Sequence, residues 1–243
     1  VRALAAAHDL SWDEVVSALP GDAVTHRILD LPFHDRKRLD QTVPFELEAH
    51  LPFELEDTVI DFQVLARNDD GSSQVLAVAA PKKAVREHLA ALAAAGIDPR
   101  LVDLTSLASL NVVREAAANR GGRIAFVGLD AGRTTIALLA DGRLTGLRVV
   151  SHGVADGGDF ERCLREVRWS LLALAGGEPL TSLWVGGDAA DTPGAMAALG
   201  RTLGATPQSL DTLMLAAVPV TLRAKQAAFA TSLGLALRQA GDT

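Results

Sequence analysis

The chain has 243 residues, of which 49% are hydrophobic, and its formal net charge is −7. This length suits one large domain or two small ones with a substantial core, and the acidic balance without a basic block argues against nucleic acid as a partner. No apolar run reaches the roughly 18 residues of a membrane-spanning helix. A single cysteine, Cys163, excludes an internal disulfide and fits a reducing compartment. Because the sequence begins with Val1 and shows no signal peptide, we expect a piece of a longer protein.

The first hundred residues predict a small α+β segment. Residues 1–19 begin in a helix and end in a strand near 14–18, and alternation of apolar and polar residues predicts a strand over 24–31. Two further strands, 58–66 and 74–80, are joined by a turn and complete an antiparallel sheet.

Two helices accompany these strands. Asp35 can cap a helix with an apolar stripe of Leu39, Val43 and Leu47, which Pro44 should kink or restart and Pro52 should end. A second helix begins at Pro81 and ends at Gly96, and its predicted buried stripe is Val85, Leu89 and Leu92.

A short motif occurs twice in this region, as Pro44-Phe-Glu-Leu-Glu48 and as Pro52-Phe-Glu-Leu-Glu56. Its glutamates could act as an acid and a base or bind a metal, but no histidine is spaced to complete such a site. A solvated helix face is the simplest interpretation. The alternative that concerns function is an exposed acidic and aromatic docking edge.

The middle of the chain predicts a helix over 104–119, with Leu107, Leu110 and Val113 inward, followed by a boundary at Gly121-Gly122. A strand over 124–127 then leads through Asp130-Ala-Gly132 to a second strand, 136–139. Asp141-Gly142 is typical of a tight hairpin turn, and 144–150 is the returning strand.

The last part of the chain predicts helices around one short strand. A helix that starts at Asp156–Asp159 carries an inner face of Phe160, Leu164, Val167, Leu171 and Leu174, and Gly176-Gly177 ends it. The strand 183–185 runs into Gly186-Gly187, and a helix over 196–203 follows. A final helix over 225–239 should bury Phe229, Leu233 and Leu237 and stop at Gly241.

The candidate ligand site consists of the two glycine-bearing turns that follow strands 124–127 and 183–185. A carboxylate such as Asp130 beside a glycine can lie close to a phosphate-bound metal, so the two turns could form walls around a nucleotide. The alternative is that Asp130-Ala-Gly132 is only a polar loop tip. Neither turn matches a P-loop or a dinucleotide fingerprint.

Catalytic residues are not predicted. Cys163 shares a helix face with Phe160 and Val167, which indicates a core position rather than a nucleophile. The six histidines are scattered without spacing for zinc, and Ser151-His152 lacks a nucleophile elbow and a third orienting group.

Several short motifs, taken in order, carry a family resemblance: Leu31-Pro-Phe33, Phe45-Glu-Leu-Glu48, Leu51-Pro-Phe53, Asp61, Asp130-x-Gly132-x-x-Thr135, Arg148, Gly153, Gly186-Gly187 and Leu233-Gly-Leu-Ala-Leu-Arg238. Together they resemble the actin-like proteins of pilus and secretion machines. These are the type IV pilus assembly protein PilM and the cytoplasmic domain of the type II secretion protein GspL, with the cell-division protein FtsA more distant. The resemblance spans nearly the whole chain.

The resemblance implies an α/β, actin-like (ribonuclease H-like) fold of two lobes with an inserted α+β subdomain. Residues 1–21 would be a remnant of the first lobe, 22–103 the insert, 104–120 a helix of the first lobe, 121–224 the second lobe and 225–243 a helix that returns to the first. By position, Asp130, Gly132 and Thr134 resemble the second phosphate loop and Gly186 and Gly187 the adenosine loop, with Glu166 on the helix beside the base.

The first phosphate loop of the family has no counterpart in this sequence, since family members carry it some tens of residues before the position of Val1. A nucleotide held from one lobe only would lose half of its backbone donors. We therefore expect no cofactor for these residues, with Mg-ATP as the alternative.

The resemblance implies a non-enzymatic scaffold at the cytoplasmic face of the bacterial inner membrane, with a nucleotide-dependent switch or weak ATPase in the parent protein as the alternative. The first function predicted is recruitment of the motor ATPase of a type II secretion system, and the alternative is a PilM-like pilus protein that binds ATP and the N-terminal peptide of a partner. Expected partners are the motor ATPase and a platform protein of the PilN or GspM type. Membrane association is expected through these partners or through a segment beyond Thr243. The resemblance is also compatible with a homodimer. The predicted docking residues are Phe45, Glu48, Phe53, Glu54, Glu56 and Asp57.

Overall fold

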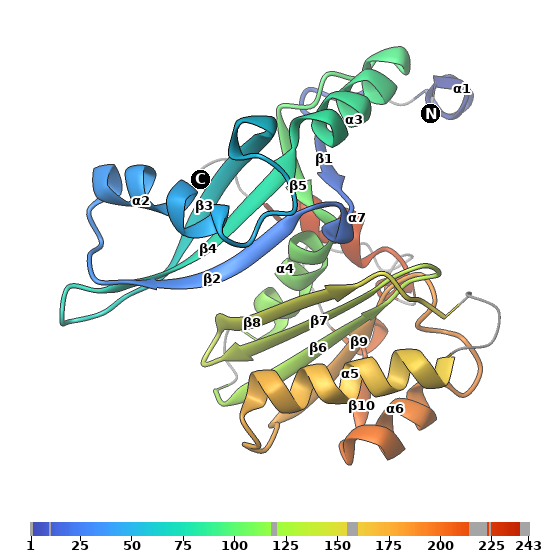
Figure 1. Cartoon of the computed structure of the whole chain (residues 1–243). Coiled ribbons are helices and arrows are strands. Elements are labelled where there is room, and N and C mark those ends of the chain that lie inside the picture. The colour runs from blue at the N-terminus through green and yellow to red at the C-terminus, as the bar shows by residue number, and fades with distance from the viewer. Residues whose placement is uncertain are drawn as a thin grey trace. The chain divides into compact units, whose positions relative to one another are not determined.

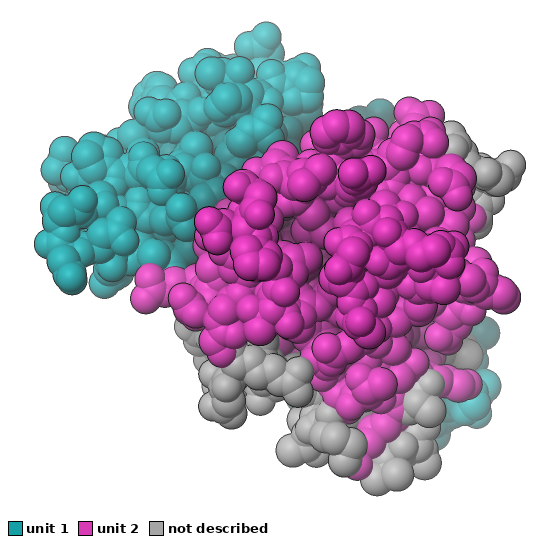
Figure 2. All heavy atoms as spheres, turned by 90° about the horizontal axis from the view of Figure 1, so that it is seen from below, with its two compact units in different colours: residues 1–104 teal, residues 105–243 magenta. Residues whose placement is uncertain are grey.

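The computed structural model describes residues 2–9, 11–117, 121–154, 160–213, 223 and 225–238. The chain divides into two compact units, residues 1–104 and 105–243 (Figure 2). Each unit is described by itself below. The finer division into five segments stays a prediction, and so do the helix start at 156–159 and the stop at Gly241, which lie outside the described residues.

Unit 1 contains a three-stranded sheet, a two-stranded sheet and several helices. Its elements are α1 (Arg2–Ala7), β1 (Val16–Leu19), η1 (Gly21–Ala23), β2 (Thr25–Leu31), α2 (Arg36–Glu48), η2 (Leu55–Asp57), β3 (Thr58–Arg67), β4 (Ser73–Pro81), α3 (Lys82–Ala94) and β5 (Leu101–Leu104).

The predicted antiparallel sheet is present, with strand order β2-β4-β3 (Figure 1). Helix α2 packs on this sheet through Leu39, Val43 and Leu47, which are fully buried against core residues of β2 and β4. The carboxylate of Asp35 accepts the backbone N–H of Arg38 at 3.0 Å, which is the predicted N-cap. The stripe therefore determines which face of α2 is buried.

Proline does not divide α2. The helix continues through Pro44 and ends at Glu48, before Pro52. A proline in a helix interior removes one backbone hydrogen bond and crowds the preceding turn. Here the adjacent Val43 and the stripe residue Leu47 are fully buried, and this packing keeps the helix in one piece.

Helix α3 departs from the predicted pattern. It ends before Gly96, whose φ of +76° suits the glycine that terminates a helix. None of its side chains is fully buried, and Leu89 is 37% exposed rather than part of a buried stripe. The stripe prediction was wrong at Leu89, whereas Val85 and Leu92 are half-buried.

Strand β5 was not predicted. It pairs in parallel with β1, with Val16 opposite Leu101 and Leu19 opposite Leu104. Four residues show too little alternation to indicate a strand, and their pairing partner lies far away in sequence. Only the tertiary structure shows that β1 and β5 pair.

Unit 2 is built on a five-stranded sheet of order β10-β9-β6-β7-β8. Its elements are α4 (Thr105–Ala117), β6 (Arg123–Leu129), β7 (Thr134–Ala140), β8 (Arg143–Val150), α5 (Phe160–Ala175), β9 (Ser182–Gly186), α6 (Ala195–Leu203), β10 (Pro207–Ser209), η3 (Leu210–Thr212) and α7 (Ala230–Ala236).

The central strands of this sheet are covered on both faces. Residues Ile124 to Leu129 and Thr134 to Leu139 are buried without interruption, as expected of strands between two layers of helices. Helices α5 and α6 lie on one face and α4 on the other, where α4 packs against α7 (Figure 1). The predicted hairpin is confirmed, since Asp141 and Gly142 have φ of +49° and +77° between β7 and β8.

The final helix is shorter than predicted. α7 covers Ala230–Ala236, and Phe229 is its exposed N-cap, 46% accessible, rather than a core residue. The close approach to α4 is made instead at Gly234, where a Cβ would clash with the backbone of Ala108. The residue that makes the close contact with α4 is therefore a glycine. A prediction based on the periodicity of hydrophobic residues cannot identify such a position.

No helix within the described ranges is both long and apolar enough to cross a lipid bilayer.

Truncation of the buried stripe of α2 should destabilise the protein strongly. Leu39 is fully buried, so Leu39→Ala is expected to cost about 2–5 kcal/mol in the free energy of unfolding. Phe45→Ala on the same helix is the control, because Phe45 is 68% exposed and its loss should change stability by less than about 0.5 kcal/mol. Urea denaturation followed by circular dichroism measures both, and equal losses would contradict the packing of α2.

Candidate functional site

The two predicted turns lie side by side at one edge of the sheet. Strands β6 and β9 are parallel neighbours, with Gly128 opposite Gly186, so the segments that follow both strands leave the sheet at the same edge. Asp130 to Arg133 forms the first turn, and Gly186 to Asp188 begins the second.

Reciprocal hydrogen bonds join the turns. The carboxylate of Asp130 accepts the backbone N–H of Asp188 at 3.2 Å, and the carboxylate of Asp188 accepts the backbone N–H of Ala131 at 3.0 Å. The backbone N–H of Ala189 donates to the carbonyl of Leu129 at 2.9 Å. We call the Asp130–Asp188 pair of bonds the aspartate clasp. Asp188 was not among the predicted site residues, although it directly follows Gly186-Gly187.

Glycine permits this close approach at two positions. Gly187 has φ of +101°, and a Cβ there would clash with the backbone of Leu129. Gly153 lies against the first turn, where a Cβ would clash with the carbonyls of Asp130 and Ala131. By contrast, Gly132 is exposed and has open space around it. Gly187 is thus required by the contact between the turns, whereas Gly132 is not.

Thr134 and Glu166, two further predicted nucleotide residues, are engaged within unit 2. Thr134 is fully buried, and its hydroxyl donates to the carbonyl of His152 at 2.8 Å and lies 3.1 Å from the thiol of Cys163. Glu166 on α5 lies 3.5 Å from the guanidinium of Arg148 on β8. Both contacts tie strands of the sheet to neighbouring segments.

Cys163 is a core residue, as predicted. It is fully buried on α5. Burial raises the pKa of the thiol, the hydrogen bond with Thr134 opposes this, and the negative charge of Glu166 adds to it. A thiol held in its neutral form is a poor nucleophile.

The resemblance found in the sequence offers Mg-ATP as the alternative ligand of these turns, and the residues do not fit a phosphate as they are arranged. A phosphate oxygen would accept backbone N–H groups of the first turn. The N–H of Ala131 already donates to Asp188, and the carboxylate of Asp188 brings a negative charge to the same place. Within the described ranges, no cluster of three metal-binding side chains is present.

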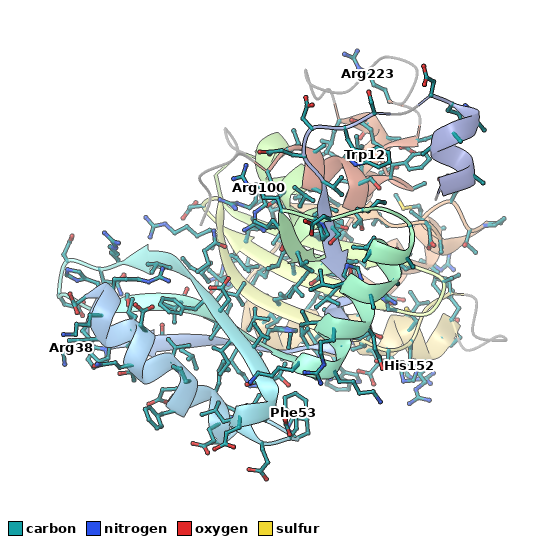
Figure 3. The ribbon with its side chains drawn as sticks, turned by 90° about the horizontal axis from the view of Figure 1, so that it is seen from above. Trp12, Arg38, Phe53, Arg100, His152 and Arg223 are labelled. Atoms are coloured by element: carbon teal, nitrogen blue, oxygen red, sulfur yellow. The ribbon has the colours of Figure 1, made fainter. Side chains whose placement is uncertain are left out.

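The predicted docking residues lie in unit 1, at the end of α2 and in the segment that follows (Figure 3, where Arg38 marks the start of α2 and Phe53 the segment beyond it). Phe45 is 68% exposed, Phe53 is half-buried, and the four acidic residues are exposed: Glu48, Glu54, Glu56 and Asp57. The ammonium of Lys82 reaches this segment and donates to the carbonyl of Glu56.

The predicted docking residues belong to a longer acidic stretch of the sequence. Residues 39–66 contain seven carboxylates and no lysine or arginine, so this stretch alone equals the formal charge of −7. All seven side chains are exposed: Asp40, Glu46, Glu48, Glu54, Glu56, Asp57 and Asp61. We call this stretch, with Phe45, the acidic edge; Asp40, its first member, pairs with Arg36 at 2.9 Å. The exposure of Phe45 and of the predicted acidic residues agrees with the expected acidic and aromatic edge, whereas their role in docking stays a prediction.

Comparison with known proteins identifies the family. The sequence profile of a family described as type IV pilus assembly protein PilM matches residues 1–157, which is more than half of the chain. The chain belongs to the PilM family.

Solved structures agree with this assignment at the level of the fold. A PilM–PilN type IV pilus biogenesis complex matches with a TM-score of 0.84 and 22% identity, covering 98% of this chain and 82% of that chain. A Bacteroides thetaiotaomicron protein of actin-like ATPase fold and unknown function matches with a TM-score of 0.54 and 12% identity, covering 82% and 69%. The predicted α/β, actin-like fold of this PilM family member is therefore confirmed.

A third similar structure is the cytoplasmic domain of EpsL, an inner-membrane component of the type II secretion system of Vibrio cholerae. It matches with a TM-score of 0.49 and 18% identity, covering 76% of this chain and 65% of that chain.

The contact between the turns should depend on Gly187. Gly187→Ala adds a Cβ that clashes with Leu129 at a positive φ, so we expect a loss on the order of 1–3 kcal/mol from backbone strain alone. Gly132→Ala, with open space around it, should leave the melting temperature nearly unchanged. Thermal unfolding of both variants measures the difference, and equal melting temperatures would contradict this arrangement.

The thiol of Cys163 should be inert in the folded protein. Because burial keeps it protonated and inaccessible, a disulfide reagent such as DTNB should react much more slowly with native than with urea-unfolded protein at neutral pH. Absorbance of the released thiolate measures both rates. Similar rates in both states would show that this face of α5 is open.

Proposed function

We propose that this chain is an actin-like adaptor of a type IV pilus assembly machine. In this proposal it works by protein–protein recognition at the cytoplasmic face of the inner membrane and does not turn over a substrate. Membership of the PilM family supports the pilus role. The type II secretion role predicted first has weaker support. The EpsL structure matches with a TM-score of 0.49, which is too low to support an argument from fold similarity.

The acidic edge is the docking surface in this proposal. The observation that carries it is a stretch of unit 1, residues 39–66, with seven exposed carboxylates, no lysine or arginine, and an exposed phenylalanine. Aromatic side chains serve as anchors in protein interfaces, while charges around them set partner choice and association rate. A surface of this composition selects a basic partner segment that carries an apolar residue.

The partner we propose is the cytoplasmic N-terminal segment of a PilN-type platform protein. PilM and PilN form the complex in the similar solved structure. Short cytoplasmic segments next to a membrane helix are enriched in lysine and arginine, which is the charge that complements the acidic edge. Binding there would hold the adaptor at the membrane through its partner.

Recruitment of the motor ATPase is a second element of the proposal, and it requires a surface other than the acidic edge. Trp169 and Leu172 on the outer face of α5 are 67% and 47% exposed, with Arg165 and Arg168 exposed on the same helix. Tryptophan and arginine are enriched where interfaces gain most of their affinity. This face of unit 2 is therefore available for a further protein contact.

Charge reversal at the acidic edge should weaken binding of the PilN-type segment. We expect Glu54→Lys/Glu56→Lys to lower the affinity for a synthetic peptide of that segment by about tenfold, because two attractions become repulsions. Asp69→Lys/Asp98→Lys is the matched control, with the same charge change on exposed positions of unit 1 outside the edge. Fluorescence anisotropy of the labelled peptide measures all three proteins.

The salt dependence separates specific docking from general attraction. Binding to the wild-type protein should weaken as the salt concentration rises, and the edge variant should show a smaller dependence than the control variant. Phe45→Ala should reduce the affinity without affecting the salt dependence, since it removes apolar contact. If the edge and control variants lose affinity equally, the acidic edge is not the docking surface.

A further inference from the structure

The aspartate clasp places a carboxylate against a backbone N–H of the first turn. Asp188 is an exposed residue whose side chain accepts the N–H of Ala131 at 3.0 Å. A carboxylate and a phosphate oxygen are chemically similar acceptors of a backbone N–H, and both prefer charge-assisted hydrogen bonds of this kind. The turn thus already has an anion bound to it, and that anion is part of the chain.

The second half of the clasp keeps this anion in position. The carboxylate of Asp130 holds the N–H of Asp188 at 3.2 Å, so the backbone that carries Asp188 is fixed to the same turn that its side chain contacts. The N–H of Gly187 donates to the carbonyl of Ala227 at 2.8 Å, and the N–H of Ala227 donates to the carboxylate of Asp211 at 2.8 Å. Asp188 therefore extends from a segment that is anchored on both sides.

We propose that Asp188 is an internal substitute for a phosphate, which closes the first turn to nucleotides and other anions. The proposal does not depend on the docking partner proposed above. An incoming phosphate must displace the Asp188 carboxylate from the N–H of Ala131, and it also meets the negative charge of that carboxylate. The two effects are distinct, one being occupancy of a donor and the other repulsion.

The first turn is accessible from solvent, so binding of an anion to it can be tested in the whole protein. Gly132 is exposed and has nothing within 4 Å of a Cβ position, so an anion can approach the turn from solvent. Removal of the Asp188 side chain should consequently expose a donor that solutes can reach, rather than a donor buried behind other groups.

Two substitutions separate occupancy from repulsion. Asp188→Asn removes the charge but keeps a side-chain oxygen that can accept the N–H of Ala131. Asp188→Ala removes both the charge and the acceptor. Asp188→Ser, whose hydroxyl is shorter than the carboxylate, is a second truncating variant for the case in which the alanine variant folds poorly. Thermal unfolding establishes that each variant is folded.

Binding is measured with inorganic phosphate and with Mg-ATP by isothermal titration calorimetry and by amide NMR shifts of alanine-labelled protein. We expect the wild-type protein to bind both weakly, and Asp188→Asn to bind more tightly because repulsion is removed. Asp188→Ala should bind about tenfold more tightly than Asp188→Asn, which is the gain expected from one freed charge-assisted donor. The amide signal of Ala131 should shift when Asp188 is truncated and shift back when phosphate is added.

Three results would overturn the proposal. Equal affinities of the asparagine and alanine variants would mean that Asp188 acts by its charge alone. No gain in any folded variant would mean that the turn has no capacity for an anion. An Ala131 signal that does not respond to truncation of Asp188 would mean that the hydrogen bond is absent in solution.

Discussion

The contact between the Asp130 and Gly187 turns is the constraint on which the arrangement of unit 2 depends. Parallel pairing of β6 and β9 brings the turns to one edge of the sheet, and Gly187 allows the backbone to pass against Leu129 where any side chain would clash. Hydrogen bonds from Ala189 to Leu129 and across the aspartate clasp then close the contact. The same groups that could have held a ligand hold the fold together instead.

Helix α2 of unit 1 has one buried face and one exposed face. The stripe of Leu39, Val43 and Leu47 is fully buried against the sheet, whereas Phe45 extends into solvent from the same turn of helix. At the start of α2, the guanidiniums of Arg36 and Arg38 lie over the rings of Phe62 and Phe33 at 4.4 and 4.2 Å, contacts that attach this end to the sheet. The C-terminal end of α2 carries exposed Phe45 and Glu48, which lie outside this buried stripe.

An actin-like fold does not by itself imply turnover of a nucleotide, because a fold can be retained while the chemistry of its site changes. In this chain the two turns predicted to border a nucleotide are joined to each other by the carboxylates of Asp130 and Asp188, and Thr134 is directed into the core. The most distinctive chemistry is instead on the surface, in the acidic edge of unit 1.

Local patterns in the sequence determined much of the fold. The apolar stripe and cap of α2, the Asp141-Gly142 hairpin and the core position of Cys163 follow from periodicity and turn chemistry, which act between residues close in sequence. The tertiary structure alone decided the β1–β5 pair, the exposure of Leu89 and Phe229, and the reciprocal bonds of Asp130 and Asp188. Each of these features depends on which distant segment of the chain packs against the residue concerned. A contact between two segments far apart in the sequence produces no periodic pattern in the sequence of either segment.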